Sequence, residues 1–263
     1  MDTQDLIKIA VSFVTAGIWI SAATFLAERL GSRVGGLIAN LPSNIVVSLV
    51  FVALLHNASF AAEATPAVPV GMLIDTIFLF IFILAATRGL MVAIILSLIS
   101  WLALAIVAAK LVYSDWTINI ILYVVITVLL FFALGRLIKI PDAASSKKKY
   151  SLNQLLIRAL FAGAVVAATV ILSTFAGTYW TGLFTTFPAV LLSTMVILAY
   201  NQSIAFAQAT GKILILSSSN IVVYGIGVYV TYPTLGIVWG TIISFVAAFA
   251  WVWLLSPVLK RLR

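Results

Sequence analysis

The chain is poor in the residues that most catalytic and metal sites require. Among its 263 residues are no cysteine, one histidine and seven acids. The lack of cysteine excludes disulfides, thiolate chemistry and cysteine-ligated metals. We find no metal-ligand cluster, no nucleophile–histidine–acid set, no glycine-rich phosphate loop and no paired carboxylates in the sequence. We therefore expect a protein that is not an enzyme and has no catalytic residue, no metal site and no cofactor.

Charge of either sign is also scarce. Charged residues make up 8% of the chain and hydrophobic residues 64%, with a mean hydropathy of +1.24, whereas a soluble domain has about 25% charged residues. The main partner is therefore the lipid bilayer. The net charge of +8 does not indicate a nucleic-acid partner, because the cations lie at the ends of apolar stretches and in one short linker, where membrane topology explains them.

Long apolar stretches make up most of the chain. A transmembrane helix needs about 20 apolar residues, and the sequence has nine candidate stretches. No alternating strand pattern is present, so helices are expected to satisfy the backbone inside lipid. The sequence predicts an all-α polytopic membrane protein. Its expected spans are 6–27, 35–55, 68–87, 89–112, 117–138, 153–174, 181–200, 213–231 and 234–256.

Lysine and arginine gather in two places that set the expected orientation. One is the linker 139–150, with three consecutive lysines, and the other is the tail after residue 259. Cytoplasmic loops carry such cations, whereas the loops expected at 56–67 and 175–180 have none. We expect a location in the cell inner (cytoplasmic) membrane, with the N-terminus outside and the C-terminus in the cytoplasm.

The chain contains a weak internal repeat. Residues 7–56 align without a gap with residues 153–202 at an offset of 146 positions, and ten residues are identical. The clearest shared element is Gly-Leu followed by four residues and proline. The identical residues of the first copy are Ala16, Gly17, Ala22, Leu26, Gly31, Gly36, Leu37, Pro42, Val50 and Ala53.

The span 117–138 has no counterpart in the repeat, and one extra crossing would turn the second copy upside down. The sequence therefore predicts two inverted four-helix repeats, residues 1–115 and 153–263. A linking helix and basic cytoplasmic linker at 116–152 would join them. Inverted repeats are the usual architecture of secondary transporters.

The repeated prolines, Pro42 and Pro188, are predicted to interrupt a span. A proline inside a helix removes one backbone hydrogen bond, and the freed carbonyl groups could bind a cation or a donor group. The alternative is a kink that only lets helices pack closely at the neighbouring glycine. Polar neighbours at this break are Asn40, Ser43, Asn44, Thr185, Thr186 and Thr194.

Asp75 is the one carboxylate predicted deep in a span. Such a residue costs about 2.5–3.5 kcal/mol at a helix centre and usually faces a functional cavity. At an offset of 145 its repeat partner is Asn220, which follows Ser217, Ser218 and Ser219. We predict an ion or proton site at the midplane. The alternative is an Asp75 that lies near the outer interface or pairs as structural glue.

The segments Arg33-Val34-Gly35-Gly36-Leu37…Leu41-Pro42 and Tyr179-Trp180-Thr181-Gly182-Leu183…Phe187-Pro188-Ala189 resemble the second-helix signature of small GlpM-like membrane proteins, Gly-Leu-x-x-x-Phe-Pro. That family has four spans and no settled function. The resemblance covers the first two spans of each copy and implies a fused, duplicated form. It transfers no binding or catalytic residue.

We predict a secondary transporter of a small solute or ion that works by alternating access. An oligomeric channel, a homodimer among its forms, and a non-transporting membrane scaffold or subunit are the alternatives. The expected site residues are Asp75, Asn220, Ser217, Ser218, Ser219, Asn40, Asn44, Thr185 and Thr186.

Overall fold

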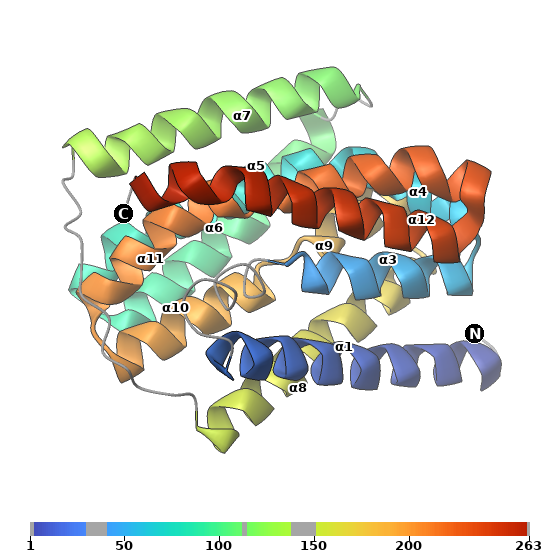
Figure 1. Cartoon of the computed structure of the whole chain (residues 1–263), viewed down its shortest axis with the longest axis horizontal. Helices are drawn as coiled ribbons and strands as arrows, with labels where there is room; N and C mark the ends of the chain where they lie inside the picture. Colours follow the sequence, from blue (N-terminus) through green and yellow to red (C-terminus); the bar gives the residue numbers. More distant parts are fainter. Residues whose placement is uncertain (1–2, 30–40, 112–114, 138–150, 262–263) are drawn as a thin grey trace.

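Helices form the regular structure of residues 3–29, 41–111, 115–137 and 151–261, which the computed structural model describes (Figure 1). Helices satisfy backbone groups within one segment, as a chain in lipid requires. The elements up to residue 111 are α1 (Thr3–Arg29), α3 (Ser43–Leu55), α4 (Ala58–Ala64), the 3-10 turn η1 (Thr65–Ala67), α5 (Val68–Ala85), the 3-10 turn η2 (Ala86–Arg88) and α6 (Leu90–Leu111).

The remaining elements begin with α7, which corresponds to the expected span 117–138. They are α7 (Trp116–Phe132), the π-helical turn η3 (Ala133–Leu137), α8 (Leu152–Leu172), α9 (Gly177–Thr185), α10 (Ala189–Asn201), α11 (Ile204–Ser217) and α12 (Asn220–Arg261). α12 doubles back on itself at Gly236, whose φ is +74° (Figure 1). Glycine adopts this left-handed region without the steric cost that a Cβ imposes.

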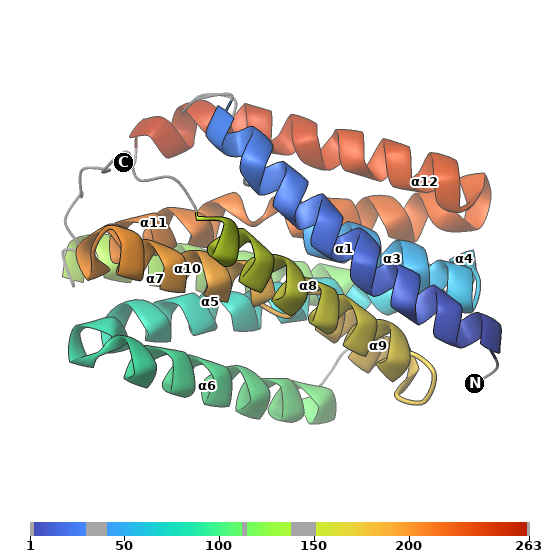
Figure 2. The same ribbon diagram turned by 90° about the horizontal axis from the view of Figure 1, so that it is seen from below.

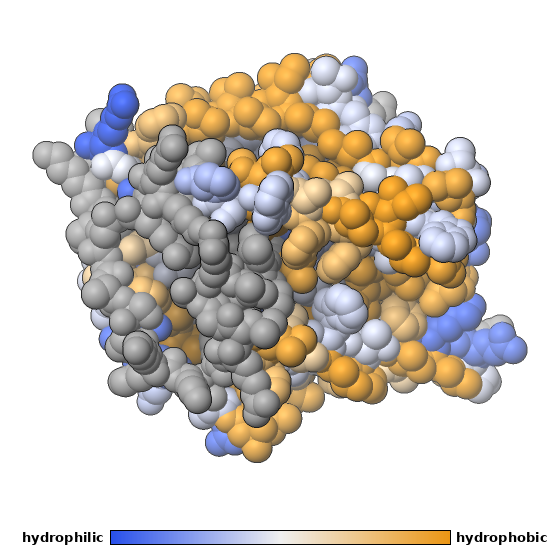
Figure 3. Space-filling view, viewed as in Figure 1, coloured by the Kyte–Doolittle hydropathy of each residue, from blue (hydrophilic) through white to orange (hydrophobic). Residues whose placement is uncertain are grey.

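Within the described residues, seven helical stretches are long and apolar enough to cross a membrane. The last, Ile204–Pro257, includes the reversal at Gly236, and α3 with 13 residues is shorter than a span. Apolar side chains dominate the coloured part of the face in Figure 3, and the strongly hydrophilic ones lie at its edges. The protein is therefore an all-helical membrane protein.

Several predicted loop and helix boundaries were wrong. The expected outer loop 56–67 contains α4 and η1, and α9 begins at Gly177 within the expected loop 175–180. The expected span 213–231 is divided, because α11 ends at Ser217 and α12 begins at Asn220. Hydropathy failed here because it measures apolar length, and it does not detect a change of helix direction inside an apolar stretch.

Pro42 and Pro188 do not lie inside helices. They immediately precede α3 and α10, and α9 ends at Thr185, so the second proline follows a true break between two helices. Proline fits the start of a helix because the first turn has no partner for its missing N–H. The expectation of a kinked, continuous span is therefore wrong at 181–200. For 35–55, residues 30–40 lie outside the described chain.

The same local backbone recurs at the offset of 146. After each proline comes a helix of 13 residues, α3 or α10. An extended residue then caps the next helix, where the Asn57 side chain accepts from Phe60 N at 2.8 Å and the Ser203 side chain accepts from Phe206 N at 3.1 Å. Asparagine and serine are preferred caps because their short side chains satisfy a free N–H of the first turn.

α1 and α8 pack side by side in both orientations (Figures 1 and 2). A Cβ at Gly17 would lie 3.2 Å from Ala159 O, and one at Gly163 would lie 2.7 Å from Phe13 O. These contacts run in opposite directions along the two helices, so α1 and α8 are antiparallel. Small residues let two backbones approach closely, which is a main source of helix association in lipid.

Candidate functional site

Asp75 is buried in the middle of α5, with 1% of its surface exposed. Its Oδ1 accepts a hydrogen bond of 2.9 Å from the indole Nε1–H of Trp101 on α6. The Trp101 ring packs edge-on against Phe184 and Phe187, with centroids 5.4 and 4.9 Å away. The carboxyl group of the first half is therefore joined, through one indole, to the α9–α10 break of the second half.

The face of α5 that bears Asp75 also contacts the break directly. One turn before Asp75, a Cβ on Gly71 would overlap Thr186 Oγ1. Thr185 and Thr186 are buried, and their hydroxyls donate to the carbonyls of Gly182 and Leu183 at 2.6 and 2.7 Å. These two predicted site residues therefore lie at the break. Thr186 is in direct contact with the Asp75 helix.

Asn220 and its serine neighbours form the junction between α11 and α12. Contacts of Gly225 with Val68 and of Gly211 with Ile83 show that this part of the chain runs antiparallel to α5. Asn220, with 0% of its surface exposed, thus lies at about the level of Asp75 on a neighbouring element. The hydrogen bond of Asp75 goes to Trp101, however, and not to Asn220.

The serines at this junction differ in what they contact. Ser217 and Ser218 are buried, with 1% and 8% of their surfaces exposed. The Ser219 hydroxyl accepts a hydrogen bond of 2.9 Å from Trp251 Nε1–H on the returning arm of α12. Hence Ser219 is held by a tryptophan from the following helix, as Asp75 is.

Of the two predicted asparagines of the first copy, only Asn44 can be located, because Asn40 lies outside the described residues. Asn44 is in the first turn of α3, and its amide oxygen and nitrogen are buried with no hydrogen-bond partner in the described chain. Ser48, one turn later, is 0% exposed, and its hydroxyl is also buried with no hydrogen-bond partner in the described chain. A buried amide without a partner costs free energy, so this face of α3 suits a polar ligand or water.

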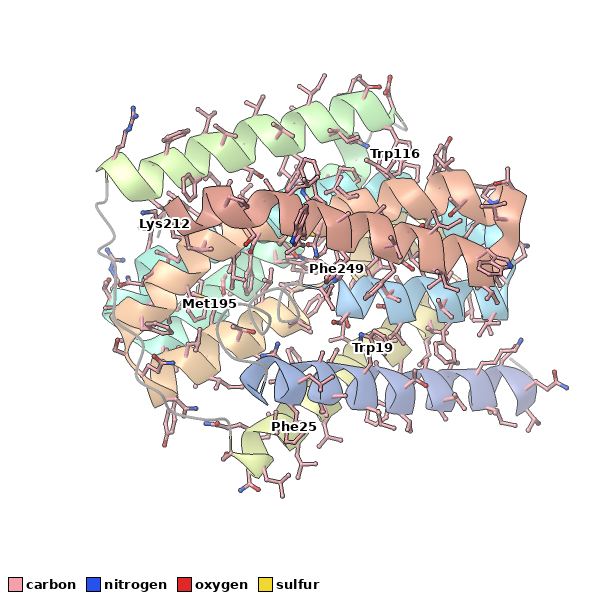
Figure 4. All side chains as sticks on the ribbon, in the orientation of Figure 1. Trp19, Phe25, Trp116, Met195, Lys212 and Phe249 are labelled. Carbon is pink, nitrogen blue, oxygen red and sulfur yellow. The ribbon has the colours of Figure 1, made fainter. Side chains whose placement is uncertain are left out.

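α7 carries a polar face that the sequence did not indicate as a site. Its buried side chains are Asn119, Tyr123, Thr127 and Phe131. They recur every four residues, so they form one stripe, and the stripe lies toward α5 and η1. Figure 4 shows Lys212 of α11 near the far end of α7, where its Nζ lies 5.8 Å from the Phe131 ring centroid.

Arg158 lies early in α8 but is buried. It is only 7% exposed, and its Nη1 donates to Thr194 Oγ1 at 2.9 Å. The contact joins α8 to α10. Packing between two helices therefore holds the guanidinium inside.

The described residues contain no group of three or more His, Asp or Glu side chains able to hold a metal ion. What they do contain is one buried carboxyl group and several buried hydroxyls at a break between helices. Such an arrangement can bind and release a proton or a small cation, or hydrogen-bond a small polar solute.

The comparisons with known proteins concern the first half of the chain. No curated protein and no solved structure gave a significant match. Residues 9–118, which cover most of α1 through the start of α7, match the profile of a family described as protein of unknown function (DUF3147). The match does not name the GlpM-like family, and it does not extend to the second half. The first half of this chain is thus similar to an uncharacterised family.

Proposed function

We propose that the protein is a secondary transporter of a small solute or ion that works by alternating access. The observation that carries the proposal is the burial of Asp75 beside a break between helices, with Trp101 joining the two. A carboxyl group inside a membrane span is costly and is usually retained for function. Broken helices at the midplane are the common binding element of transporters.

We propose further that the chain consists of two inverted four-helix repeats with nine crossings. The recurring backbone around Pro42 and Pro188 supports the duplication. Gly17 and Gly163 are equivalent at the offset of 146, as are Phe13 and Ala159, so the α1–α8 contact is reciprocal. A reciprocal antiparallel contact is what a two-fold axis in the membrane plane would produce.

The finer family and topology assignments belong to the same proposal. The Gly-Leu-(x4)-Pro motif supports a fused relative of the GlpM-like family, and the profile match ends at residue 118, close to the end of the proposed first repeat. α1 begins and α12 ends at opposite ends of the long axis (Figure 1). This supports termini on opposite sides of the membrane. The lysines and arginines of the linker 139–150 and of the C-terminal tail support an external N-terminus and a cytoplasmic C-terminus in the inner membrane.

The second candidate is a non-transporting membrane scaffold or subunit. It is favoured by the hydrogen bond between Asp75 and Trp101, since polar pairs between helices also act as structural glue in membranes. In that case the carboxyl group would stabilise the fold without changing its state.

Uptake by vesicles containing Asp75→Asn or the unchanged protein separates the two candidates. The amide keeps an oxygen that accepts from Trp101 but cannot gain or lose a proton at this position. With a solute panel and an imposed proton or sodium gradient, we expect gradient-driven uptake by the unchanged protein and loss of coupling in Asp75→Asn. Trp251→Phe, at the other tryptophan contact, should keep coupling. Equal coupling in the Asp75→Asn variant would contradict the role of Asp75, and the absence of gradient-driven uptake by the unchanged protein would contradict the transporter proposal.

A further inference from the structure

α7 lies against the helix that bears Asp75, and polar contacts hold the two together. Asn119 Nδ2 donates to Pro66 O at 3.1 Å, and two turns later the hydroxyls of Thr127 and Thr76 lie 3.3 Å apart. The contacts advance in the same direction on both elements, so α7 runs parallel to α5. Thr76 directly follows Asp75. The polar stripe of α7 therefore passes the level of the buried carboxyl group.

Tyr123 lies on this stripe, one turn before Thr127. It is 3% exposed, and its hydroxyl makes no hydrogen bond within the described chain. Because Thr127 meets Thr76, the residue after Asp75, Tyr123 lies about one turn along α7 from the level of Asp75. A buried phenol normally finds a partner, and leaving it without one costs about 1–3 kcal/mol. An available donor thus lies within about one turn of the level of the carboxyl group.

The charge on a buried Asp75 must be compensated, because an isolated ion inside an apolar environment is too costly to persist. No lysine or arginine forms an ion pair with Asp75 among the described residues. Of the described titratable side chains on elements packed against α5, Tyr123 is the one that lies on the α7 stripe beside Thr76, and its buried hydroxyl has no hydrogen bond there. The remaining ones are Arg88, Lys110, Arg136, Tyr179, Lys212, Tyr224, Tyr229 and Tyr232.

The surroundings of Asp75 suit a proton better than a metal cation. Mg²⁺ and Ca²⁺ take about six or more oxygen ligands. Here the hydroxyls that α5 and α7 place around this level are those of Thr76 and Thr127, which bond to each other, and that of Tyr123 one turn earlier on α7. A proton needs only one of the two carboxyl oxygens.

We propose that the ion bound at Asp75 is a proton and that Tyr123 is a positioning residue for its release. When the site opens to water, the proton leaves a carboxyl oxygen for a water molecule, forming hydronium. The carboxylate then accepts hydrogen bonds from Tyr123 O–H and Trp101 N–H, and Tyr123 keeps its own proton. The use of this proton in transport rests on the proposed function, but the binding of the proton to Asp75 can be measured without transport.

Difference infrared spectroscopy of the purified full-length protein during a pH titration tests the proposal. The carboxyl C=O band is assigned by its loss in Asp75→Asn. In Tyr123→Phe we expect the band to shift and Asp75 to bind its proton about tenfold more tightly, the size expected for one lost hydrogen bond to a charged group. Tyr224→Phe is the matched control, because Tyr224 is 0% exposed and its hydroxyl also lacks a hydrogen bond in the described chain.

A band and titration that are the same in Tyr123→Phe and the unchanged protein would overturn the role of Tyr123. The band could instead change when sodium chloride replaces choline chloride at fixed pH and stay constant when the pH changes. That result would contradict the claim that the ion bound at Asp75 is a proton. If the titration behaves as expected but no gradient drives uptake of any solute, the proton site stands and the transporter proposal fails. The two failures are therefore distinguishable.

Discussion

The α5–α6 pair and the α12 hairpin each place a tryptophan of the returning helix against a polar residue, which lies within α5 in one case and directly before α12 in the other. In α5–α6, Trp101 donates to Asp75, and the exposed fractions of these side chains are 2% and 1%. In α12, Trp251 donates to Ser219, and the indole is 39% exposed. The two hairpins thus share a contact but differ in its burial and in the charge of the acceptor.

This difference indicates where the molecule carries a group that can change its charge. A hydroxyl bonded to a lipid-facing indole is a neutral pair with little electrostatic consequence. A carboxyl group bonded to a buried indole, by contrast, changes charge when it binds a proton, and low-dielectric surroundings enlarge that effect. We infer that the first half supplies the ionisable group, Asp75, and the second half supplies the helix break that packs on its partner Trp101.

The largest effect should follow from separating the halves at α9. A Cβ on Gly182 would overlap the carbonyl oxygen of Ala64, which is backbone and cannot swing away. Gly182→Val should therefore destabilise the fold by roughly 3 kcal/mol or more, seen as loss of folded protein in a thermal-stability assay in detergent. Thr178→Val, in the same helix, is the control. A Gly182→Val protein as stable as that control would show that the two halves are not seated as described.

The tryptophan pair should respond unequally. Trp101→Phe removes the donor to a buried carboxyl group and should cost roughly 2 kcal/mol, whereas Trp251→Phe removes a partly exposed neutral bond and should cost about 0.5 kcal/mol. Melting temperatures of the two variants in one detergent check the order. Equal losses would remove the distinction between the hairpins.

The smallest effect concerns the reciprocal contact of α1 with α8. A Cβ at Gly163 would lie 2.7 Å from Phe13 O, against 3.2 Å for Gly17 and Ala159 O. Gly163→Ala should therefore destabilise by about 1 kcal/mol and Gly17→Ala by less, measured by the same thermal assay. If Gly17→Ala were the more damaging change, the tighter side of the contact would have been misassigned.

The sequence predicted the uninterrupted helices well. The expected spans 89–112 and 153–174 correspond to α6 and α8. Each of these helices starts at a residue that marks a helix end, Gly89 with its positive φ before α6 and the Ser151–Gln154 capping box before α8. Pro188 indicated a break, and the structure has one between α9 and α10. The short α4 was not predicted, because it lies in a segment that was expected to be a loop. The Asn57 and Ser203 caps are the local signal that could have indicated the helices after α3 and α10.

For the candidate site, the sequence indicated Asp75 and the threonines of the break but not their neighbours. Trp101 and Tyr123 occupy unremarkable positions in apolar stretches, and only the packing of α6 and α7 on α5 brings them to the carboxyl group. Span 117–138 was interpreted as a linking helix because it has no repeat partner. Its buried polar spacing at Asn119, Tyr123 and Thr127 was the available signal.

Alternating access to the Asp75 region is the central claim, and single-cysteine labelling tests it most directly. Because the chain has no cysteine, Thr186→Cys introduces the only thiol, in a residue that contacts the Asp75 helix. Two exposed positions, Phe175→Cys and Tyr200→Cys, with 74% and 82% of the native side chains exposed, serve as references for the outer and inner sides. Membrane-impermeant thiol reagents are added to either side of oriented vesicles.

We expect each reference cysteine to react from one side only and Thr186→Cys to react from both sides, since the site would open to each in turn. Reaction of Thr186→Cys from neither side, or from one side alone, would contradict alternating access and favour a scaffold.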